Sequence, residues 1–178
     1  MPALLIRPSV DGDVDAIAAI YAHHVLHGSG TFETEAPDPI EMRRRRDDVH
    51  AKGLPWLVAD DGGVVVGYAY ANHFRPRHAY RYCLEDSIYL RPDAAGRGVG
   101  RALLAELIAR CTAAGARQVL ALIGDSANLA SIGLHRACGF VSCGRIDAAG
   151  WKFGRWIDVV LMQRPLGDGA RSHPGEAA

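Results

Sequence analysis

The amino-acid sequence predicts a single mixed α/β domain. Hydrophobic runs of strand length alternate with stretches in which apolar residues recur at helical spacing, a pattern typical of helices packed on a sheet. The 178 residues are enough for one domain with a hydrophobic core and few for two. From Gly167 onward Gly, Pro, Ala and polar residues prevail, so we expect a domain over residues 1–166 and a disordered tail over 167–178.

One strand and two helices are predicted first. Residues 4–7 have strand length. A helix with one buried stripe is predicted by the apolar spacing of Val14, Ile17, Ala18, Tyr21 and Val25. Residues 28–35 are rich in glycine and hydroxyl side chains, which favour a loop. The second helix is predicted to begin at Asp38, whose side chain can cap it, and Pro39 suits the first helical position. This helix extends to about Lys52.

Three strands follow. The hydrophobic runs 55–59 and 64–71 are joined by Asp60-Asp61-Gly62-Gly63, a sequence that favours a hairpin turn. The third run covers residues 82–90 and ends before Arg91-Pro92.

The remainder of the chain returns to alternating elements. Leu103, Leu104, Leu107 and Ile108 mark a helix that ends near Gly115. We expect a strand at 119–123, a helix at 128–138, a strand after Gly139-Phe140-Val141 and a last strand at 157–162. The expected order is therefore β-α-α-β-β-β-α-β-α-β-β, without an internal repeat.

Composition excludes several classes of function. The 20 basic and 20 acidic residues balance, whereas nucleic acid or an anionic membrane would need a basic excess. No apolar run approaches the roughly 20 residues of a membrane span, and the N-terminus has no signal-like apolar segment. The four cysteines lack C-x-x-C spacing and read as reduced, small hydrophobic residues, and the scattered histidines suggest no metal site. We expect a cytoplasmic protein.

A glycine-rich loop at residues 94–101 follows a strand and opens a helix. Its central residues are Gly96, Arg97, Gly98, Val99, Gly100 and Arg101. Glycines let a backbone approach a phosphate closely, and the helix dipole favours the negative charge. A P-loop would need Gly-Lys-Ser/Thr at the end, and a dinucleotide fingerprint would need a glycine where Arg101 or Leu103 stands, so both are excluded. A phosphate loop of another kind and a plain glycine turn remain.

This loop resembles the pyrophosphate loop of the GNAT superfamily of N-acetyltransferases, whose pattern is Gln/Arg-x-x-Gly-x-Gly/Ala. Gly98 and Gly100 match the two glycines, whereas Ala95 stands in the place of the Gln or Arg. The resemblance implies a central, mostly antiparallel mixed sheet flanked by helices, with acetyl-CoA as co-substrate. Residues 96–101 would hold its pyrophosphate, with charge from Arg97 and Arg101.

The segment 128–140 resembles the second part of the same cofactor site. The superfamily places Asn and Ser at the start of this helix, which implies that Asn128 and Ser131 reach the pantetheine arm or the phosphates. Helix capping is the alternative for Asn128. His135 stands where many of these enzymes carry a Tyr that protonates the leaving thiolate, a role that the imidazole chemistry permits. A histidine satisfied within the helix is the alternative there.

Further segments resemble one branch of the superfamily, the phosphinothricin and methionine-sulfoximine acetyltransferases. The resemblance extends from Ile6 to Pro165. It is carried by residues 31–35, 55–59, 68–71, 75–80, 84–90 and 149–158.

The branch implies a general base at Glu85. An ammonium group cannot attack a thioester until it loses a proton. Burial and the neighbouring Asp86 would raise the pKa of Glu85 towards a useful range. Asp86 should point to the opposite face of the strand, and an exposed strand-end acid is the alternative for Glu85.

The other expected site residues come from three segments. In the superfamily a strand bulge frees backbone N–H groups for the oxyanion, which here implies Ile88, Tyr89 and Leu90. Arg75 and Arg77 have the forked donors that suit the carboxylate of an amino acid. Phe32 and Glu33 would form another wall, with Glu33 near the substrate ammonium. Residues 43–46, all arginine, are expected to be a solvated helix face.

The resemblance implies acetyl transfer from acetyl-CoA to the α-amino group of a small amino acid or analogue. The aromatic segment 151–156 implies a homodimer, because in this branch it packs near a dimer interface; core packing of the tryptophans is the alternative. Another amine acceptor, such as a protein N-terminus or a polyamine, and a non-catalytic acyl-CoA-binding module are the alternative functions.

Overall fold

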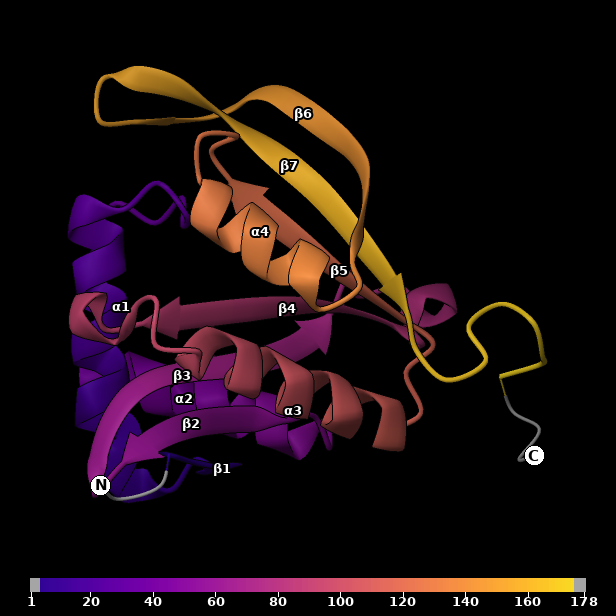
Figure 1. Ribbon diagram of the computed structural model, residues 1–178, viewed down its shortest axis with the longest axis horizontal. Helices are drawn as coiled ribbons and strands as arrows, with labels where there is room; N and C mark the ends of the chain where they lie inside the picture. Colours follow the sequence, from indigo (N-terminus) through magenta and orange to yellow (C-terminus); the bar gives the residue numbers. More distant parts are fainter. Residues whose placement is uncertain (1–3, 175–178) are drawn as a thin grey trace.

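The computed structural model describes residues 4–174, which form one seven-stranded sheet flanked by α-helices (Figure 1). The elements are β1 (Leu4–Pro8), α1 (Val14–His27), α2 (Pro39–Ala51), β2 (Trp56–Asp61), β3 (Val64–His73), β4 (Cys83–Leu90), α3 (Val99–Ala113), β5 (Gln118–Gly124), α4 (Leu129–Ala137), β6 (Val141–Lys152) and β7 (Arg155–Pro165). Their order confirms the predicted one.

The sheet has the order β1-β2-β3-β4-β5-β7-β6, and its neighbours are antiparallel except for the parallel pair β4 and β5. Helices α1 and α2 contact each other over one face, and α3 and α4 cover the other, as the ribbon shows (Figure 1). The predicted mixed, mostly antiparallel sheet is confirmed.

Apolar stripes dictate how the helices pack. The five stripe residues predicted for α1 are all buried, as are Leu103, Leu104, Leu107 and Ile108 on α3. Each leucine side chain removed from water in this way contributes roughly 1.5–3 kcal/mol. Helix α2 starts as predicted, since the Asp38 side chain accepts a hydrogen bond from the Glu41 amide at 2.8 Å.

The two parallel strands separate partway along their length. Pairing between β4 and β5 stops at Asp86 and Ala121. Beyond that point β4 remains paired with β3 as far as Leu90, and β5 remains paired with β7 as far as Gly124. The sheet is therefore split at its centre.

Two expectations differ from the structure. The first part of the tail, 167–174, is not free of the domain, because Leu166 is buried and the Arg117 guanidinium donates to the carbonyls of Gly169 and Ser172; residues 175–178 lie outside the described residues. The arginine run is not wholly solvated either. Arg46 is 5% exposed, because it faces Asp11 and forms ion pairs with Asp11 and Asp47.

The described residues contain no helix that is both long and apolar enough to cross a membrane.

Candidate active site

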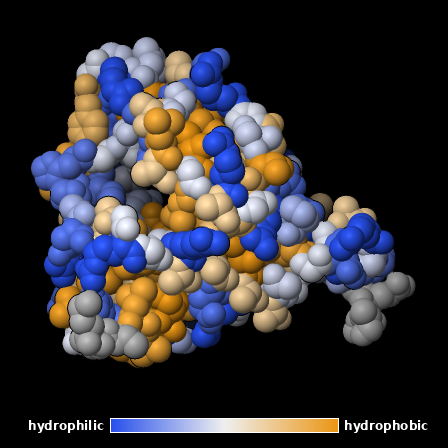
Figure 2. All heavy atoms as spheres, in the orientation of Figure 1, coloured by the Kyte–Doolittle hydropathy of each residue, from blue (hydrophilic) through white to orange (hydrophobic). Residues whose placement is uncertain are grey.

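A cavity of about 930 Å³ opens where β4 and β5 part. The surface is hollowed between the start of α4 and the end of β4 (Figure 2). Twelve of the predicted site residues line this cavity: Phe32, Glu85, Ile88, Tyr89, Leu90, Gly96, Gly98, Gly100, Arg101, Asn128, Ser131 and His135. The structure thus brings together residues from four segments of the chain, around positions 32, 85–90, 96–101 and 128–135.

The glycine loop forms one rim of the cavity. Gly96 and Gly98 have φ values of 74° and 82°, in the left-handed region that favours glycine. Gly98 is the N-cap of α3 and offers no side chain, so the amides at the start of this helix are not capped from within. Val99 is buried and is not among the residues that line the cavity. The loop is therefore a backbone cradle that suits an anion.

Strand β4 contributes backbone amides to the gap. At the ends of the β3–β4 ladder, Arg91 N–H donates to Val66 and Phe74 N–H donates to Cys83, so the odd-numbered residues of β4 bond to β3. The amides of Ile88 and Leu90 consequently face the gap, whereas that of Tyr89 faces β3.

The predicted bulge is absent from the paired residues of β3 and β4, whose register has no shift. The amides are freed by the separation of β4 from β5 instead. The expected contribution of the Tyr89 amide is wrong for the same reason: alternation along the strand turns it towards β3.

The start of α4 forms the opposite rim. Asn128 is the N-cap, and its side-chain oxygen accepts a hydrogen bond from the Ser131 amide at 3.2 Å. Capping uses that oxygen and leaves the amide NH₂ of Asn128 for a ligand. The Ser131 hydroxyl lies 3.4 Å from Nδ1 of His135.

The two loop arginines are placed differently. Arg101, exposed on the first turn of α3, lines the cavity. Arg97 does not line it, because its guanidinium forms an ion pair with Asp61 at 2.8 Å. The expectation that Arg97 supplies charge to the pyrophosphate is therefore not met in this arrangement.

Glu85 is half-buried on the wall of the cavity, beside the point where β4 and β5 part. Burial raises the pKa of its carboxyl, the charge of Asp86 raises it further, and Arg75 partly opposes the shift. The direction and both causes agree with the sequence-based expectation. A carboxylate with a raised pKa is a better proton acceptor than an exposed glutamate.

Asp86 points to the opposite face of β4, as predicted, and meets His135 on α4. Nε2 of His135 lies 3.0 Å from Oδ2 of Asp86, and Nδ1 lies 2.8 Å from the Ser131 carbonyl oxygen. Both partners can accept, so the distances fit an arrangement in which both ring nitrogens donate and a protonated His135 faces the Asp86 carboxylate. Burial alone would lower the pKa of His135, but the hydrogen bond and charge of Asp86 outweigh it and raise that pKa.

This geometry revises the predicted role of His135. Its side chain is only 3% exposed, and neither N–H is free for a leaving thiolate. The satisfied helix histidine, which the sequence left open, describes it better. The pair ties α4 to β4 directly beside the gap.

The predicted acceptor residues are divided by the structure. Phe32 lines the cavity, but Glu33 does not. The Glu33 carboxylate accepts from Arg45 at 2.6 Å and from the Tyr21 hydroxyl at 2.9 Å, so it is already occupied. The expected contact of Glu33 with a substrate ammonium is therefore not supported. Arg45, which was expected on a solvated helix face, instead binds Glu33 next to the cavity residue Phe32.

Arg75 and Arg77 lie on the exposed segment after β3, outside the cavity lining. The guanidinium carbon of Arg75 lies 4.7 Å from the centre of the Phe74 ring. Its charge lowers the pKa of Glu85. Arg77 precedes a short 3₁₀ turn at 78–80.

His24 and Tyr70 are among the cavity residues that sequence reasoning missed. His24 on α1 donates through Nε2 to the Leu90 carbonyl at 2.7 Å, and burial lowers its pKa. Tyr70 on β3 stacks on Trp56, with ring centres 4.1 Å apart. His24 lies on the predicted first helix but outside its apolar stripe, and Tyr70 lies in the segment 68–71 that carries the family resemblance, where no role was assigned to it.

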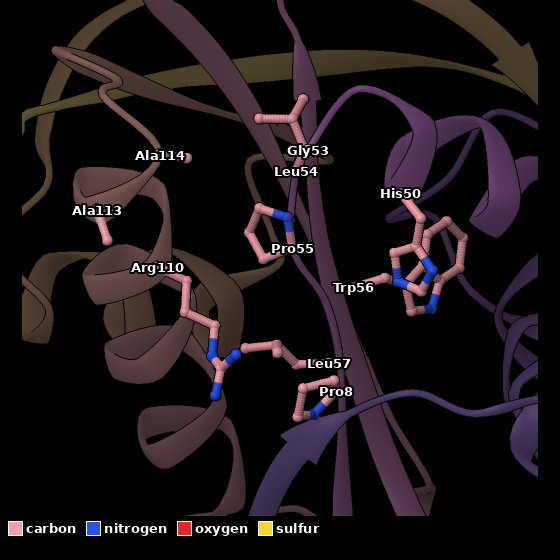
Figure 3. Close-up of a pocket in the computed structure, with 10 residues that line it drawn as sticks. All are labelled: Pro8, His50, Gly53, Leu54, Pro55, Trp56, Leu57, Arg110, Ala113 and Ala114. Atoms are coloured by element: carbon pink, nitrogen blue, oxygen red, sulfur yellow. The ribbon is translucent and has the colours of Figure 1, made fainter.

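A smaller hollow of about 420 Å³ lies between the end of α2, the start of β2 and α3 (Figure 3). The ten described residues that line it include no carboxylate, and Arg110 is bonded to Glu106 on its own helix. It lacks the acid–base groups of the larger cavity.

A split sheet that presents free amides beside a glycine loop and a half-buried glutamate suits the transfer of an acyl group from a phosphate-bearing carrier. The profile of the Acetyltransferase (GNAT) family matches residues 17–140. The chain belongs to the GNAT family of N-acetyltransferases, which confirms the resemblance found in the sequence.

Individual relatives are similar over almost the whole chain. A phosphinothricin N-acetyltransferase from Alcaligenes faecalis is 56% identical, with 97% of this chain and 87% of the relative aligned. An L-methionine sulfoximine/L-methionine sulfone acetyltransferase from Pseudomonas paraeruginosa is 41% identical, with 95% of this chain and 98% of the relative aligned. The crystal structure of a phosphinothricin acetyltransferase from Sinorhizobium meliloti, in complex with AcCoA, superposes with a TM-score of 0.94 and 48% sequence identity. The match covers 97% of this chain and 94% of the other.

Breaking the Asp86–His135 pair should produce a pH-dependent loss of stability. A raised histidine pKa stabilises the fold fully below the unfolded value of about 6.5 and ceases to do so as the pH rises through the folded-state pKa. We expect Asp86→Asn to lower the free energy of unfolding by about 3 kcal/mol at pH 6, and by less at higher pH, in urea titrations. Glu106→Gln, which removes an exposed ion pair, should change little. A loss for Asp86→Asn that is the same at all pH values would contradict the assignment.

Proposed function

We propose that the protein transfers the acetyl group of acetyl-CoA to the α-amino group of a small amino acid or analogue, such as phosphinothricin, methionine sulfoximine or methionine sulfone. The observation that carries the proposal is the position of Glu85: a half-buried carboxylate with a raised pKa, on the wall of a cavity that also contains the glycine loop. The names of the similar enzymes support the choice of acceptor.

The residues present fit acetyl-CoA. The uncapped start of α3 and the open backbone of Gly96 and Gly98 suit the pyrophosphate, and Arg101 adds a positive charge at the rim. The Ile88 and Leu90 amides in the gap suit the carbonyl oxygen of the thioester. Bound there, acetyl-CoA supplies the activated thioester.

Glu85 then removes the proton that blocks the acceptor nitrogen, directly or through a water. The free amine attacks the thioester carbonyl, and the amides of the gap donate to the oxygen that becomes negative. The nitrogen loses two protons overall: one leaves through Glu85, and the other is balanced by the thiol that CoA becomes. No step requires a metal.

The acceptor lies, in this proposal, on the α1 side of the gap. Phe32 and Tyr70 supply apolar walls, and Arg75, whose charge acts on Glu85, offers a forked cation for the α-carboxylate. Arg77 is close enough in sequence to share that role. Glu33 does not contact the acceptor in this proposal. Its carboxylate binds Arg45 of α2 and so supports the segment that carries Phe32.

The charges of the cavity argue against a polyamine. Asp86 is paired with His135 and Asp125 with Arg155, which leaves Glu85 as the carboxylate free to act on an amine among the described lining residues. A polyamine would favour several uncompensated acids. A protein N-terminus and a non-catalytic acyl-CoA-binding module remain as outcomes of the experiments below.

We further propose a homodimer in the cytoplasm. On the β6–β7 hairpin, Trp151, Phe153 and Trp156 are 59%, 55% and 61% exposed. The two tryptophans pair across the strands, with ring centres 5.3 Å apart, and so form one apolar patch. Exposed aromatic clusters are typical of interfaces rather than of free surfaces.

The acceptor class can be tested by thiol release from acetyl-CoA with a panel of amines. We expect turnover with phosphinothricin, methionine sulfoximine and methionine sulfone, and little with spermidine or a peptide with a free N-terminus, because only the former place a carboxylate next to the amine. Arg75→Gln should raise the KM of the amino acid about tenfold and leave that of acetyl-CoA unchanged. Tight CoA binding without turnover of any amine would refute the enzymatic proposal.

The role of Glu85 predicts a pH dependence. Because a base works only when deprotonated, kcat/KM should fall as the pH falls through the raised pKa of Glu85. Glu85→Gln should lower kcat at neutral pH by about 100-fold or more and remove that limb of the profile. Full activity of the variant at neutral pH would exclude Glu85 as the base, and Glu106→Gln on the exposed face of α3 is the control.

The dimer is tested by charge insertion. Trp156→Glu should place a charge in the apolar patch and convert the protein to a monomer in sedimentation velocity runs. Ile40→Glu, at a residue that is 79% exposed on α2, is the matched control and should leave the mass unchanged. A monomeric wild-type protein at micromolar concentration would refute the dimer.

A further inference from the structure

The loop between α1 and α2 is fastened to strands far along the chain. A Cβ built on Gly124, at the end of β5, would lie 2.3 Å from the Ser29 carbonyl oxygen, so loop and strand are in direct backbone contact. The Thr31 hydroxyl is 2.8 Å from that of Tyr21. The loop residues 28–32 all line the cavity. Its position therefore decides the shape of that wall.

Lys152, the last residue of β6, holds the loop from the other side. Its Nζ donates to the carbonyls of Gly28 and Thr31, both at 2.8 Å, and the residue is 4% exposed. A buried ammonium is costly unless its hydrogen bonds are made. These two bonds span the turn and keep its two ends together, and no proton-transfer role is left for this amine.

Gly150, two residues earlier on β6, receives the ring of Phe32. A Cβ on Gly150 would lie 2.3 Å from Cδ1 and 2.4 Å from Cε1 of that ring, closer than atoms can approach. The backbone of Gly150 is not in the left-handed region, so its conformation does not require glycine. The space for the Phe32 ring is what requires it.

We propose that Gly150 and Lys152 are positioning residues: β6 presses Phe32 into place and thereby sets the wall against which the acceptor side chain packs. The inference rests on the proposed function, because it takes Phe32 as part of the acceptor site. The same strand carries the Trp151 of the exposed patch, so the acceptor wall and the proposed dimer surface share one rigid element.

The test is Gly150→Ala, compared with Gly144→Ala on the same strand. A Cβ on Gly144 would meet only Leu161, at 3.7 Å, which is an ordinary contact. We expect Gly150→Ala to raise the KM of the amino acid about tenfold or more, with the KM of acetyl-CoA changed by less than about twofold. Gly144→Ala should change neither. Equal effects of Gly150→Ala on both KM values would overturn the proposal.

A double-mutant cycle identifies Phe32 as the intermediary. In a Phe32→Ala background the clash is gone, so Gly150→Ala should have almost no further effect. Additive effects would contradict the proposal. If Gly150→Ala alone does not fold, the double variant decides: recovery of the fold supports the proposal, and failure of both overturns it.

Hydrogen exchange separates this proposal from the enzymatic one. Without any acceptor, the amides of residues 28–33 should exchange at least about tenfold faster in Gly150→Ala and in Lys152→Met than in Gly144→Ala, because the loop loses its contacts. Unchanged exchange refutes the positioning role whatever the activity. Faster exchange with no turnover of any amino acid by the wild type refutes the proposed acceptor and retains the fastening of the loop.

Discussion

The parting of β4 from β5 after Asp86 and Ala121 is the constraint on which the site depends. Each strand keeps its other neighbour, so the sheet stays intact at both sides while its centre opens. The opening leaves inward backbone groups without a ladder partner, and buried polar groups need one. The protein satisfies the Leu90 carbonyl itself, through His24, and offers the amides of the gap to a ligand.

Charge around the opening is arranged by pairing. Asp86 is paired with His135, and the pair bridges β4 and α4 at the point where β4 and β5 part. Glu33 is held by Arg45 away from the cavity. Glu85 is left without such a partner, and burial together with the charge of Asp86 raises the pKa of its carboxyl. Selective pairing, rather than an excess of acid, distinguishes the proposed base.

Local rules were enough for the order of elements and for parts of the site. The cap at Asp38, the left-handed glycine at Gly98 and the strand alternation at Asp86 each depend on a few neighbouring residues. Contacts between distant segments followed no such rule. Lys152 bonds to a loop more than 120 residues away, and Arg97 of the glycine loop forms an ion pair with Asp61 at the end of β2. A residue type can suggest a cation for a ligand, but only the folded chain shows which carboxylate or carbonyl has taken it.

The opening in the sheet also bears on the sequence of binding events. Gly98 and Ser131 line it from the face that α3 and α4 cover, whereas Phe32 and Tyr70 line it from the side of α1. Two ligands that enter from opposite faces do not block each other's path. Under the proposed function, the acyl donor and the amine can therefore arrive in either order and meet inside the sheet, and the acetyl group passes between them without first being carried by the protein.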